Sequence, residues 1–277
     1  MMDPFVAPNT PSTSGLPYSG AEQFYPDGYN RPIQSFDFMR MLRAPFQSPN
    51  WVMNLVWMFV CQIAGIIVIG SLVSFGYQAE VAEARSGGRS ENWPDFNPDR
   101  FTDYLMRGLW PFLWSLIWTI PLMILLGIPV IATFVLSNIL IQGGNDVSGV
   151  IVIVTGGLVS IAAYCFVVLA MLASMMHSGL GNDFAKGADF RWIRSYVSKM
   201  GVTTIWTGIV YILIGNIMGW LGILCFCVGV LAVGPILNLM AADLLSQLHD
   251  IFVSRGGASA FEGAQTDTDI IEAQVIL

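Results

Sequence analysis

The chain has 277 residues, of which 55% are hydrophobic and 11% are charged, whereas a typical soluble domain carries about 25% charged residues. The formal net charge is −7, and all 12 lysines and arginines lie outside the long apolar blocks. The composition therefore excludes an ordinary soluble domain. It also argues against a nucleic-acid partner, because no basic patch is present to neutralise phosphates.

The N-terminal part combines a predicted tail with predicted helix starts. Residues 1–34 hold six prolines and show no apolar periodicity, so we expect a disordered tail. A cleaved signal peptide is not expected, since the first long apolar run begins at Trp51. Ser35 is expected to cap a short helix that lies in the membrane interface and ends before Pro45. Ser48-Pro49 then predicts the start of the next helix.

The first apolar block, 51–77, leaves two alternatives open. It is long enough for one membrane crossing. It can also form a re-entrant hairpin that breaks near residues 62–65, with its second helix running on to Arg85. The N-terminal arginines favour the hairpin, because one crossing would place them outside, against the positive-inside rule. These are Arg31, Arg40 and Arg43. The sequence therefore predicts four or five crossings.

Three further apolar blocks predict the remaining crossings. Block 110–141 contains Pro121 and Pro129, which we expect to kink it. Block 150–176 is a third crossing. The charge-free stretch 201–242 would measure about 63 Å as one straight helix, twice a bilayer core of about 30 Å. It predicts two crossings joined by a turn within 215–222, where Gly215 and Gly219 are expected to allow close helix approach.

The loops between the blocks predict the topology. Loops 78–109 and 178–200 each carry four lysines or arginines, whereas loop 142–149 carries none. The first two loops and the C-terminus are therefore predicted to be cytoplasmic, and loop 142–149 external. Each long loop is expected to contain a short helix, one starting at Asn97-Pro98 and the other led by Asp189. On the first, Asp99, Asp103 and Arg107 share a face, which is typical of a solvated surface and only weakly suggests a cation site.

Catalytic chemistry is not indicated. The apolar blocks contain no charged residue, so they predict no proton relay or ion-coupling site. Ser246, His249 and Asp250 share a helical face but lack an oxyanion hole or nucleophile turn. No phosphate loop, zinc spacing or cofactor motif occurs, so we predict no catalytic, cofactor-binding or metal-binding residue. The cysteines are expected to be buried free thiols; they are Cys61, Cys165, Cys225 and Cys227.

Polar residues within the blocks have two readings. Helix–helix hydrogen bonding explains Gln62, Asn138, Asn216 and Asn238. Asn216, near the predicted turn, and Asn238, beside a proline, can instead line a substrate cavity.

Several short motifs carry a resemblance to a known family. They are Phe46-Gln-Ser-Pro-Asn-Trp51, the Gly76-Tyr77 pair, Trp93-Pro94-Asp95-Phe96 and Gly108. Over roughly residues 36–250 the chain resembles the prokaryotic membrane family catalogued as domain of unknown function 4013, although Trp93 stands where that family usually has leucine. The resemblance implies a prokaryotic multi-pass membrane protein, and it assigns no catalytic or binding residue.

Together these observations predict an all-α polytopic integral membrane protein with four or five transmembrane helices and short interfacial helices. We expect a tail over 1–34, a helical membrane domain over 35–252 and a flexible acidic tail over 253–277. Within the last, the apolar segment 269–277 is suited to docking on a partner. The expected location is the cytoplasmic (inner) cell membrane.

The expected partners are membrane lipid and a protein bound by the tails, and the oligomeric state is left open. We expect a structural or adaptor protein rather than an enzyme. The alternative is a transporter or channel for an uncharged or lipid-like solute, with the broken first block and the proline-containing second block forming its pathway.

Overall fold

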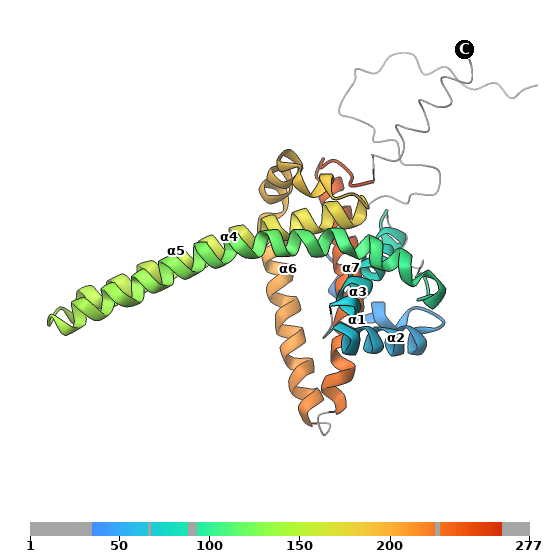
Figure 1. The fold of residues 1–277 in the computed structure, drawn as a ribbon, viewed down its shortest axis with the longest axis horizontal. Coiled ribbons are helices and arrows are strands. Elements are labelled where there is room, and N and C mark those ends of the chain that lie inside the picture. Colours follow the sequence, from blue (N-terminus) through green and yellow to red (C-terminus); the bar gives the residue numbers. More distant parts are fainter. Residues whose placement is uncertain (1–34, 66–67, 88–92, 225–227, 262–277) are drawn as a thin grey trace, which may run out of the picture.

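The computed structural model describes residues 35–65, 68–87, 93–224 and 228–261. Within these ranges the chain forms helices and no strands, which confirms the predicted all-α fold (Figure 1). The helices are α1 (Phe38–Arg43), η1 (Ala44–Phe46), α2 (Trp51–Ala64), α3 (Ile69–Arg85), η3 (Pro98–Arg100), α4 (Phe101–Gln142), α5 (Asp146–Leu180), η4 (Ala185–Ala188), α6 (Phe190–Leu224) and α7 (Val228–Ser254).

The first apolar block forms two helices instead of one. Helix α2 has 14 residues and α3 has 17, and each is shorter than the roughly 20 residues that a crossing needs. The second helix runs on to Arg85, as the hairpin alternative required. The two helices meet closely where α3 begins, because a Cβ atom on Gly70 would lie 1.8 Å from the Cys61 carbonyl oxygen.

The later blocks form longer helices than the sequence predicted. Helix α4 passes through Pro111, Pro121 and Pro129 without a break. Helix α6 continues to Leu224, so the turn predicted within 215–222 is wrong and the α6–α7 connection lies further along the chain. In water, glycine destabilises a helix and often marks its end. In lipid the backbone has no other hydrogen-bond partner, so an apolar helix continues through its glycines.

The two short helices predicted in the loops are the first turns of long helices. Asn97 caps the start of η3 and α4, since its Oδ1 atom accepts a 2.9 Å hydrogen bond from the Asp99 amide. Asp189 caps α6 by accepting from the amides of Arg191 and Trp192. Each polar segment continues into the apolar block that follows as one helix, because adding residues to an existing helix is easier than starting a new one.

Two buried clusters form a helical body, and α7 contributes to both. One cluster joins the start of α6 to the ends of α5 and α7. Its members are Ala82, Ala170, Ala173, Met176, Leu180, Trp192, Ile193, Tyr196, Met200, Leu248, Ile251, Phe252 and Ala260. The other joins α2, α3 and the start of α4 to the middle of α7. Its members are Ala44, Met58, Cys61, Val73, Tyr77, Val81, Trp93, Phe96, Tyr104, Leu239 and Ala242.

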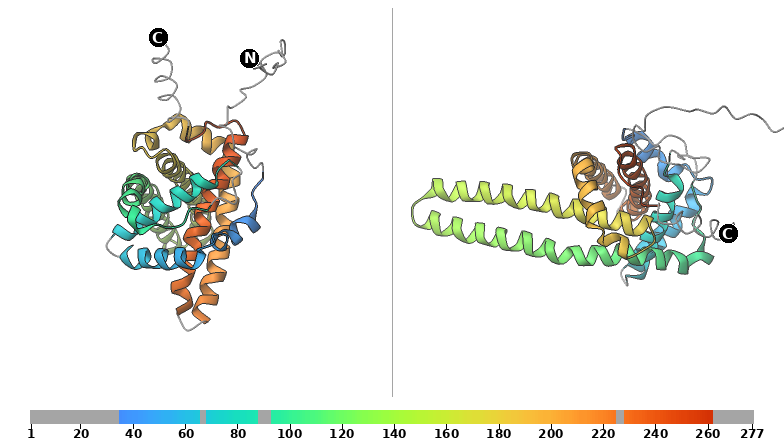
Figure 2. Two further views of the ribbon diagram at one scale, coloured as in Figure 1. Left: turned by 90° about the vertical axis from the view of Figure 1, so that its right-hand side faces the viewer. Right: turned by 90° about the horizontal axis from the view of Figure 1, so that it is seen from above.

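Two helical hairpins, α4–α5 and α6–α7, leave this body at a wide angle to each other (Figures 1 and 2). If one hairpin stood perpendicular to a flat bilayer, the other would be strongly tilted relative to the bilayer normal. The distal half of α4–α5 projects away from the body. The turn at Gly143–Asn145 lies at its far tip, whereas the segments before α4 and after α5 lie at the body.

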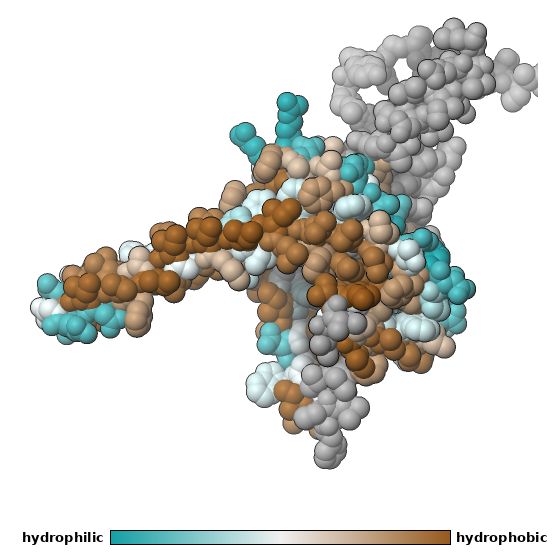
Figure 3. All heavy atoms as spheres, viewed as in Figure 1, coloured by the Kyte–Doolittle hydropathy of each residue, from teal (hydrophilic) through white to brown (hydrophobic). Residues whose placement is uncertain are grey.

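The hairpins expose apolar side chains along most of their length (Figure 3). Ile120, Met123 and Phe134 on α4 and Val202 and Trp220 on α6 are examples. In the part of the chain that the structure describes, four helices are long and apolar enough to cross a membrane. Water would be an unfavourable environment for this continuous apolar surface, and lipid is a favourable one. The fold is therefore that of a membrane protein.

Close backbone contacts occur at glycines other than the pair predicted. A Cβ on Gly108 would lie 1.8 Å from the Leu72 carbonyl oxygen, and one on Gly76 equally close to that of Tyr104. Helices α3 and α4 therefore touch backbone to backbone. Gly215 faces Leu237 at an ordinary contact distance and Gly219 faces open space, so the prediction for Gly219 is wrong.

We predict that Gly108→Ala lowers the free energy of unfolding in detergent by about 1–3 kcal/mol, because the added methyl group must push α3 and α4 apart. Gly127→Ala is the matched control, since Gly127 is in the same helix and has nothing within 4 Å of its Cβ position. That change should be neutral or stabilising by up to about 1 kcal/mol. Equal thermal unfolding midpoints for the two variants would contradict the close packing.

Candidate functional site

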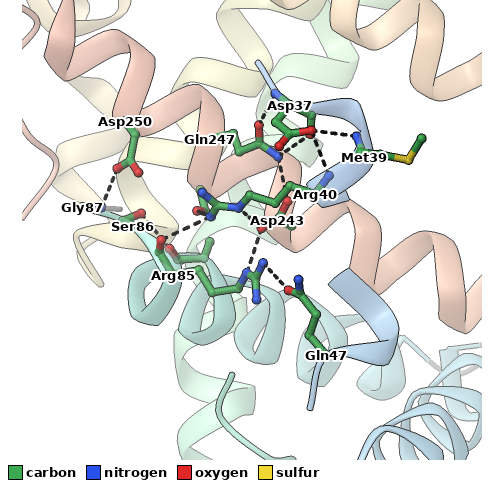
Figure 4. A network of polar contacts seen from close by, with 12 residues as sticks. Asp37, Met39, Arg40, Gln47, Arg85, Ser86, Gly87, Asp243, Gln247 and Asp250 are labelled. Carbon is green, nitrogen blue, oxygen red and sulfur yellow. Dashed lines mark hydrogen bonds and ion pairs between the residues drawn. The ribbon is translucent and has the colours of Figure 1, made fainter. Parts of the chain in front are cut away.

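A buried ionic cluster lies between the two apolar clusters, centred on Asp243 of α7 (Figure 4). Its carboxylate Oδ1 accepts from Arg85 Nε at 2.7 Å and from Arg40 Nε at 3.0 Å. Its Oδ2 accepts from Gln247 Nε2 at 2.7 Å. The side chains of Asp243 and Arg85 have no exposed surface, and that of Arg40 is 9% exposed. We call these residues, with Gln47, the Asp243 cluster.

The cluster ties together parts of the chain that are far apart in sequence. Arg40 comes from α1, Arg85 from the last turn of α3, and Gln47 follows η1. Arg85 Nη2 donates to Gln47 Oε1 at 2.8 Å, and Arg40 Nη2 donates to the Arg85 carbonyl at 3.3 Å. The Arg85 guanidinium also lies 4.7 Å from the centre of the Trp93 ring. The short N-terminal helix is thus bound into the body.

Burial and ion pairing have opposite effects on the charge of Arg85. Burial lowers the pKa of Arg85 below its usual range, and the Asp243 carboxylate opposes that shift. Arg85 Nη1 is buried without a hydrogen-bond partner among the described residues. Two guanidinium groups share one carboxylate, so loss of the carboxylate would leave two buried positive charges next to each other.

This cluster was not predicted from the sequence. The helix predicted over 35–44 forms as α1, but the prediction that Ser35 caps it is wrong. Asp37 is the cap, since its Oδ1 accepts from the amides of Met39 and Arg40. Arg40 turns inward to Asp243 because a buried carboxylate offers a stronger partner than water. The available signal was Asp243 itself, the first charge after a 42-residue stretch without one.

A second polar cluster brings together the motifs that carry the family resemblance. Asp95 Oδ1 accepts from Ser48 Oγ at 2.5 Å, and Asp95 Oδ2 accepts from Asn50 Nδ2 at 2.6 Å. The Asn54 Oδ1 atom accepts from the Phe96 amide at 2.9 Å. The hydrogen bond from Ser48 is the main cause that holds the pKa of Asp95 below its usual range. The segments 46–51 and 93–96 are therefore held side by side.

The other motif residues complete the same unit. Tyr77 donates from its hydroxyl to the Pro94 carbonyl at 2.9 Å, and Trp93 Nε1 donates to the Tyr77 hydroxyl at 3.3 Å. Gly76 and Gly108 provide the adjacent contact between α3 and α4. Motifs that are scattered over about sixty residues thus form one packed structure, which accounts for their occurrence together.

Both ends of the described chain are fixed to one turn of α7. The Gln247 side chain accepts from the Asp37 amide at 2.8 Å and donates to the Asp37 carbonyl at 3.1 Å. His249 Nε2 accepts from the Ala260 amide at 3.2 Å. Trp192 Nε1 and Lys186 Nζ donate to the carbonyls of Ala258 and Ala260, at 2.9 and 3.2 Å. Residues up to Phe261 are therefore docked, and segment 269–277 lies outside the described residues.

The polar groups considered in the sequence have structural partners. Ser246 Oγ accepts from Arg40, and Asp250 Oδ1 accepts from the Gly87 amide at 2.7 Å. His249 Nε2 binds the Ala260 amide, and its Nδ1 lies 3.7 Å from Asp250 Oδ1, while Ser246 is held by Arg40.

The charged residues at the start of α4 form separate ion pairs and do not converge on one point. Arg107 pairs with Glu83 of α3, while Arg100 pairs with Glu80 and Asp103. Cys61 and Cys165 are free thiols, and Cys225 and Cys227 lie outside the described residues.

Two adjoining cavities lie within the helical body, and neither is lined by a charged residue. The larger, of about 460 Å³, is polar and is lined by Cys61, Gln62, Gly65, Ser71, Ser74, Phe75, Gln78, Phe112, Ser115 and Asn238. The smaller, of about 280 Å³, is apolar and is lined by Phe75, Gln78, Ala79, Pro111, Leu172, Met175, Met176, Gly179, Leu180, Tyr211, Ala241, Leu244 and Leu245. Of the two candidate asparagines, Asn238 lines a cavity, whereas Asn216 is exposed and binds the Ile212 carbonyl of its own helix.

The long apolar helices, the broken first block and the buried polar body define a polytopic helical membrane protein. The chain belongs to the family described as protein of unknown function (DUF4013), whose model matches residues 58–227. The match contains three of the four motifs and begins after the fourth, segment 46–51, which the structure packs against the other three. No curated protein and no solved structure matches the chain.

We predict that Asp243→Asn lowers the free energy of unfolding by about 3–5 kcal/mol, because it leaves two buried guanidinium groups without a counter-charge. Asp103→Asn is the control: it also removes a carboxylate from an arginine, but the Asp103 side chain is 68% exposed and that of Arg100 is 47% exposed. That change should cost less than about 1 kcal/mol. Denaturant unfolding in detergent compares them, and similar losses would contradict a structural role for the Asp243 cluster.

The stability contributed by Asp95 should depend on pH. Its pKa is lower in the folded chain, so the stabilisation is complete above the usual aspartate range and is lost as the pH falls through the folded-state pKa. The stability gap between the wild type and Asp95→Asn should therefore be full at about pH 7 and close on acidification towards about pH 3. Asp95→Asn should cost less in a Ser48→Ala background. A gap that is constant with pH would contradict the role of the ionised carboxylate.

Proposed function

We propose that the protein is a structural or adaptor protein of the cell membrane that works through its two tails. The observation that supports this proposal is the anchoring of both ends on α7. Gln247 binds Asp37, and His249, two residues later, binds Ala260. The described residues that lead into 1–34 and 262–277 are therefore both held by the same turn of α7. A partner that binds both segments would meet them together.

The composition of the two segments suits partner binding. The first is rich in proline, which favours extended conformations that recognition domains bind. The second ends in the apolar residues 275–277 after an acidic stretch. An extended apolar end of this kind can add to a sheet edge of a partner.

We predict that the two segments recruit the same partner to the membrane. In-cell crosslinking from benzoylphenylalanine at Tyr25 and at Val275 should capture one common protein. Replacing either 1–34 or 262–277 with a Gly/Ser sequence of equal length should move part of that protein to the soluble fraction. A Gly/Ser replacement of the turn 143–145, far from α7, is the control. A captured protein that stays fully membrane-bound in both tail variants would contradict the adaptor role.

The proposal includes a cytoplasmic face for both tails, supported by the clustering of lysine and arginine around the body. Single cysteines at Ser12, Ser90 and Ser198 in a cysteine-free protein should be protected from an impermeant maleimide in intact cells. A cysteine at Ser148, near the tip of the α4–α5 hairpin, should be labelled. Labelling at Ser90 with protection at Ser148 would reverse the topology.

A second candidate function, transport of an uncharged or lipid-like solute, is favoured by the cavities. The break between α2 and α3 opens the polar cavity, and Pro111 of α4 lines the apolar one. Discontinuous helices are a common feature of transporter sites. Uptake of labelled glycerol, or flip of a labelled monoacylglycerol, in proteoliposomes tests this candidate separately from the tail experiments.

A further inference from the structure

We infer that the two adjoining cavities form one binding site for an uncharged amphiphile, a molecule with a hydroxyl or amide head and a hydrocarbon tail. The polar cavity takes the head and the apolar cavity takes the tail. Together they reach the size range of small-molecule sites, about 300–1,000 Å³. The inference does not depend on the adaptor role, and it requires no transport.

The head half is lined by uncharged hydrogen-bonding groups from four helices. Gln62, Ser74, Ser115 and Asn238 come from α2, α3, α4 and α7. Such groups both donate and accept hydrogen bonds, which suits hydroxyl groups. Among the described residues, the Gln62 side-chain amide makes no hydrogen bond, and its position is set by contact with the backbone at Gly234. An unpaired amide beside a cavity is a ready partner for a ligand head.

The tail half is lined almost entirely by apolar atoms. It is lined by residues of α3, α4, α5, α6 and α7, among them Leu172, Met176 and Leu244. Gly179 and Ala241 leave room in it, since their small side chains fill little volume. The methionines are flexible and can adapt to a hydrocarbon chain.

The two halves share a boundary formed by Phe75 and Gln78, which line both cavities. Gln78 Nε2 donates to Asn238 Oδ1 at 3.2 Å across this boundary. The hydrogen bond lies where the head of an amphiphile would join its tail. A bound hydroxyl can accept from Gln78 Nε2 and donate to Asn238 Oδ1, so the boundary can open without leaving either amide group unpaired.

Ionised molecules are excluded by the same lining. Neither cavity contains an acidic, basic or histidine residue. A charge moved there from water would lose hydration without gaining a counter-charge. Asp243 directly precedes the lining residue Leu244 along α7, but its carboxylate is already held by Arg40 and Arg85.

The test uses the full chain in nanodiscs and a set of molecules with one decyl-length tail and different heads. The probe is 1-decanoylglycerol carrying a photoreactive diazirine on its chain. We expect saturable labelling of peptides from α3, α5 or α7 at the cavity, which unlabelled 1-decanoylglycerol competes away. Decyl phosphate and decyltrimethylammonium should compete at least tenfold more weakly, and glycerol alone hardly at all.

Two variants assign the two halves of the site. Asn238→Leu should weaken 1-decanoylglycerol competition about tenfold, the loss expected for one buried hydrogen bond. Asn216→Leu, the same change on the exposed face of α6, should leave it unchanged. Ala241→Phe should abolish tail labelling by filling the apolar half. Thermal unfolding midpoints verify that each variant is folded, and Asn238→Ser provides a milder change if the leucine variant is not.

Equal competition by the charged decyl compounds would overturn the inference. Labelling confined to the exposed faces of the α4–α5 hairpin, or labelling that is unaffected by both Asn238→Leu and Ala241→Phe, would overturn it as well. A failed uptake or tail-crosslinking experiment would leave these binding results intact, so the three ideas can fail separately.

Discussion

The fold depends on where this chain places its few buried charges. Asp243 is enclosed by Arg40 and Arg85, and the three side chains belong to three different helices. Each charge would be costly to bury alone. Separating the pairs would leave a buried charge without a partner, so the three side chains must stay in contact. That constraint joins α1 and α3 to α7. The body that results has a polar centre, and the two apolar hairpins extend from it.

Packing around this centre combines buried apolar side chains with close backbone contact. In a membrane, lipid would surround the hairpins, so their apolar side chains would gain little by turning inward. Glycines instead let backbones touch, as Gly76 and Gly108 do between α3 and α4. The aromatic residues Trp93, Phe96 and Tyr104 then fill the space beside that contact. The family motifs are the residues that make this packing possible.

Local chemistry in the sequence predicted much of the fold. Hydropathy located the apolar blocks, and the polar break near residues 62–65 indicated the division into α2 and α3. Asn97 and Asp189 marked the starts of α4 and α6, because capping depends on neighbouring residues. The prediction of a turn within 215–222 was wrong, because glycines often end helices in water but are tolerated inside apolar helices.

The polar sites could not be predicted in the same way. The two arginine partners of Asp243 are 158 and 203 positions away along the chain, so no local pattern indicates them. The same holds for Ser48 and Asp95, although each lies in a motif that the sequence reading quoted. Asn238 was one of two equivalent candidates for a cavity, and only the packing of α7 against α3 separates it from Asn216.

The Asp243 cluster and its neighbours on α7 hold both ends of the described chain against one turn of that helix. Electron–electron distance measurement between spin labels at Ser35 and Ser259, in the protein in nanodiscs, tests it most directly. We predict one narrow distance distribution for the wild type and a broad one for Arg40→Ala. A broad distribution in the wild type, or a narrow one that Arg40→Ala leaves unchanged, would contradict the claim.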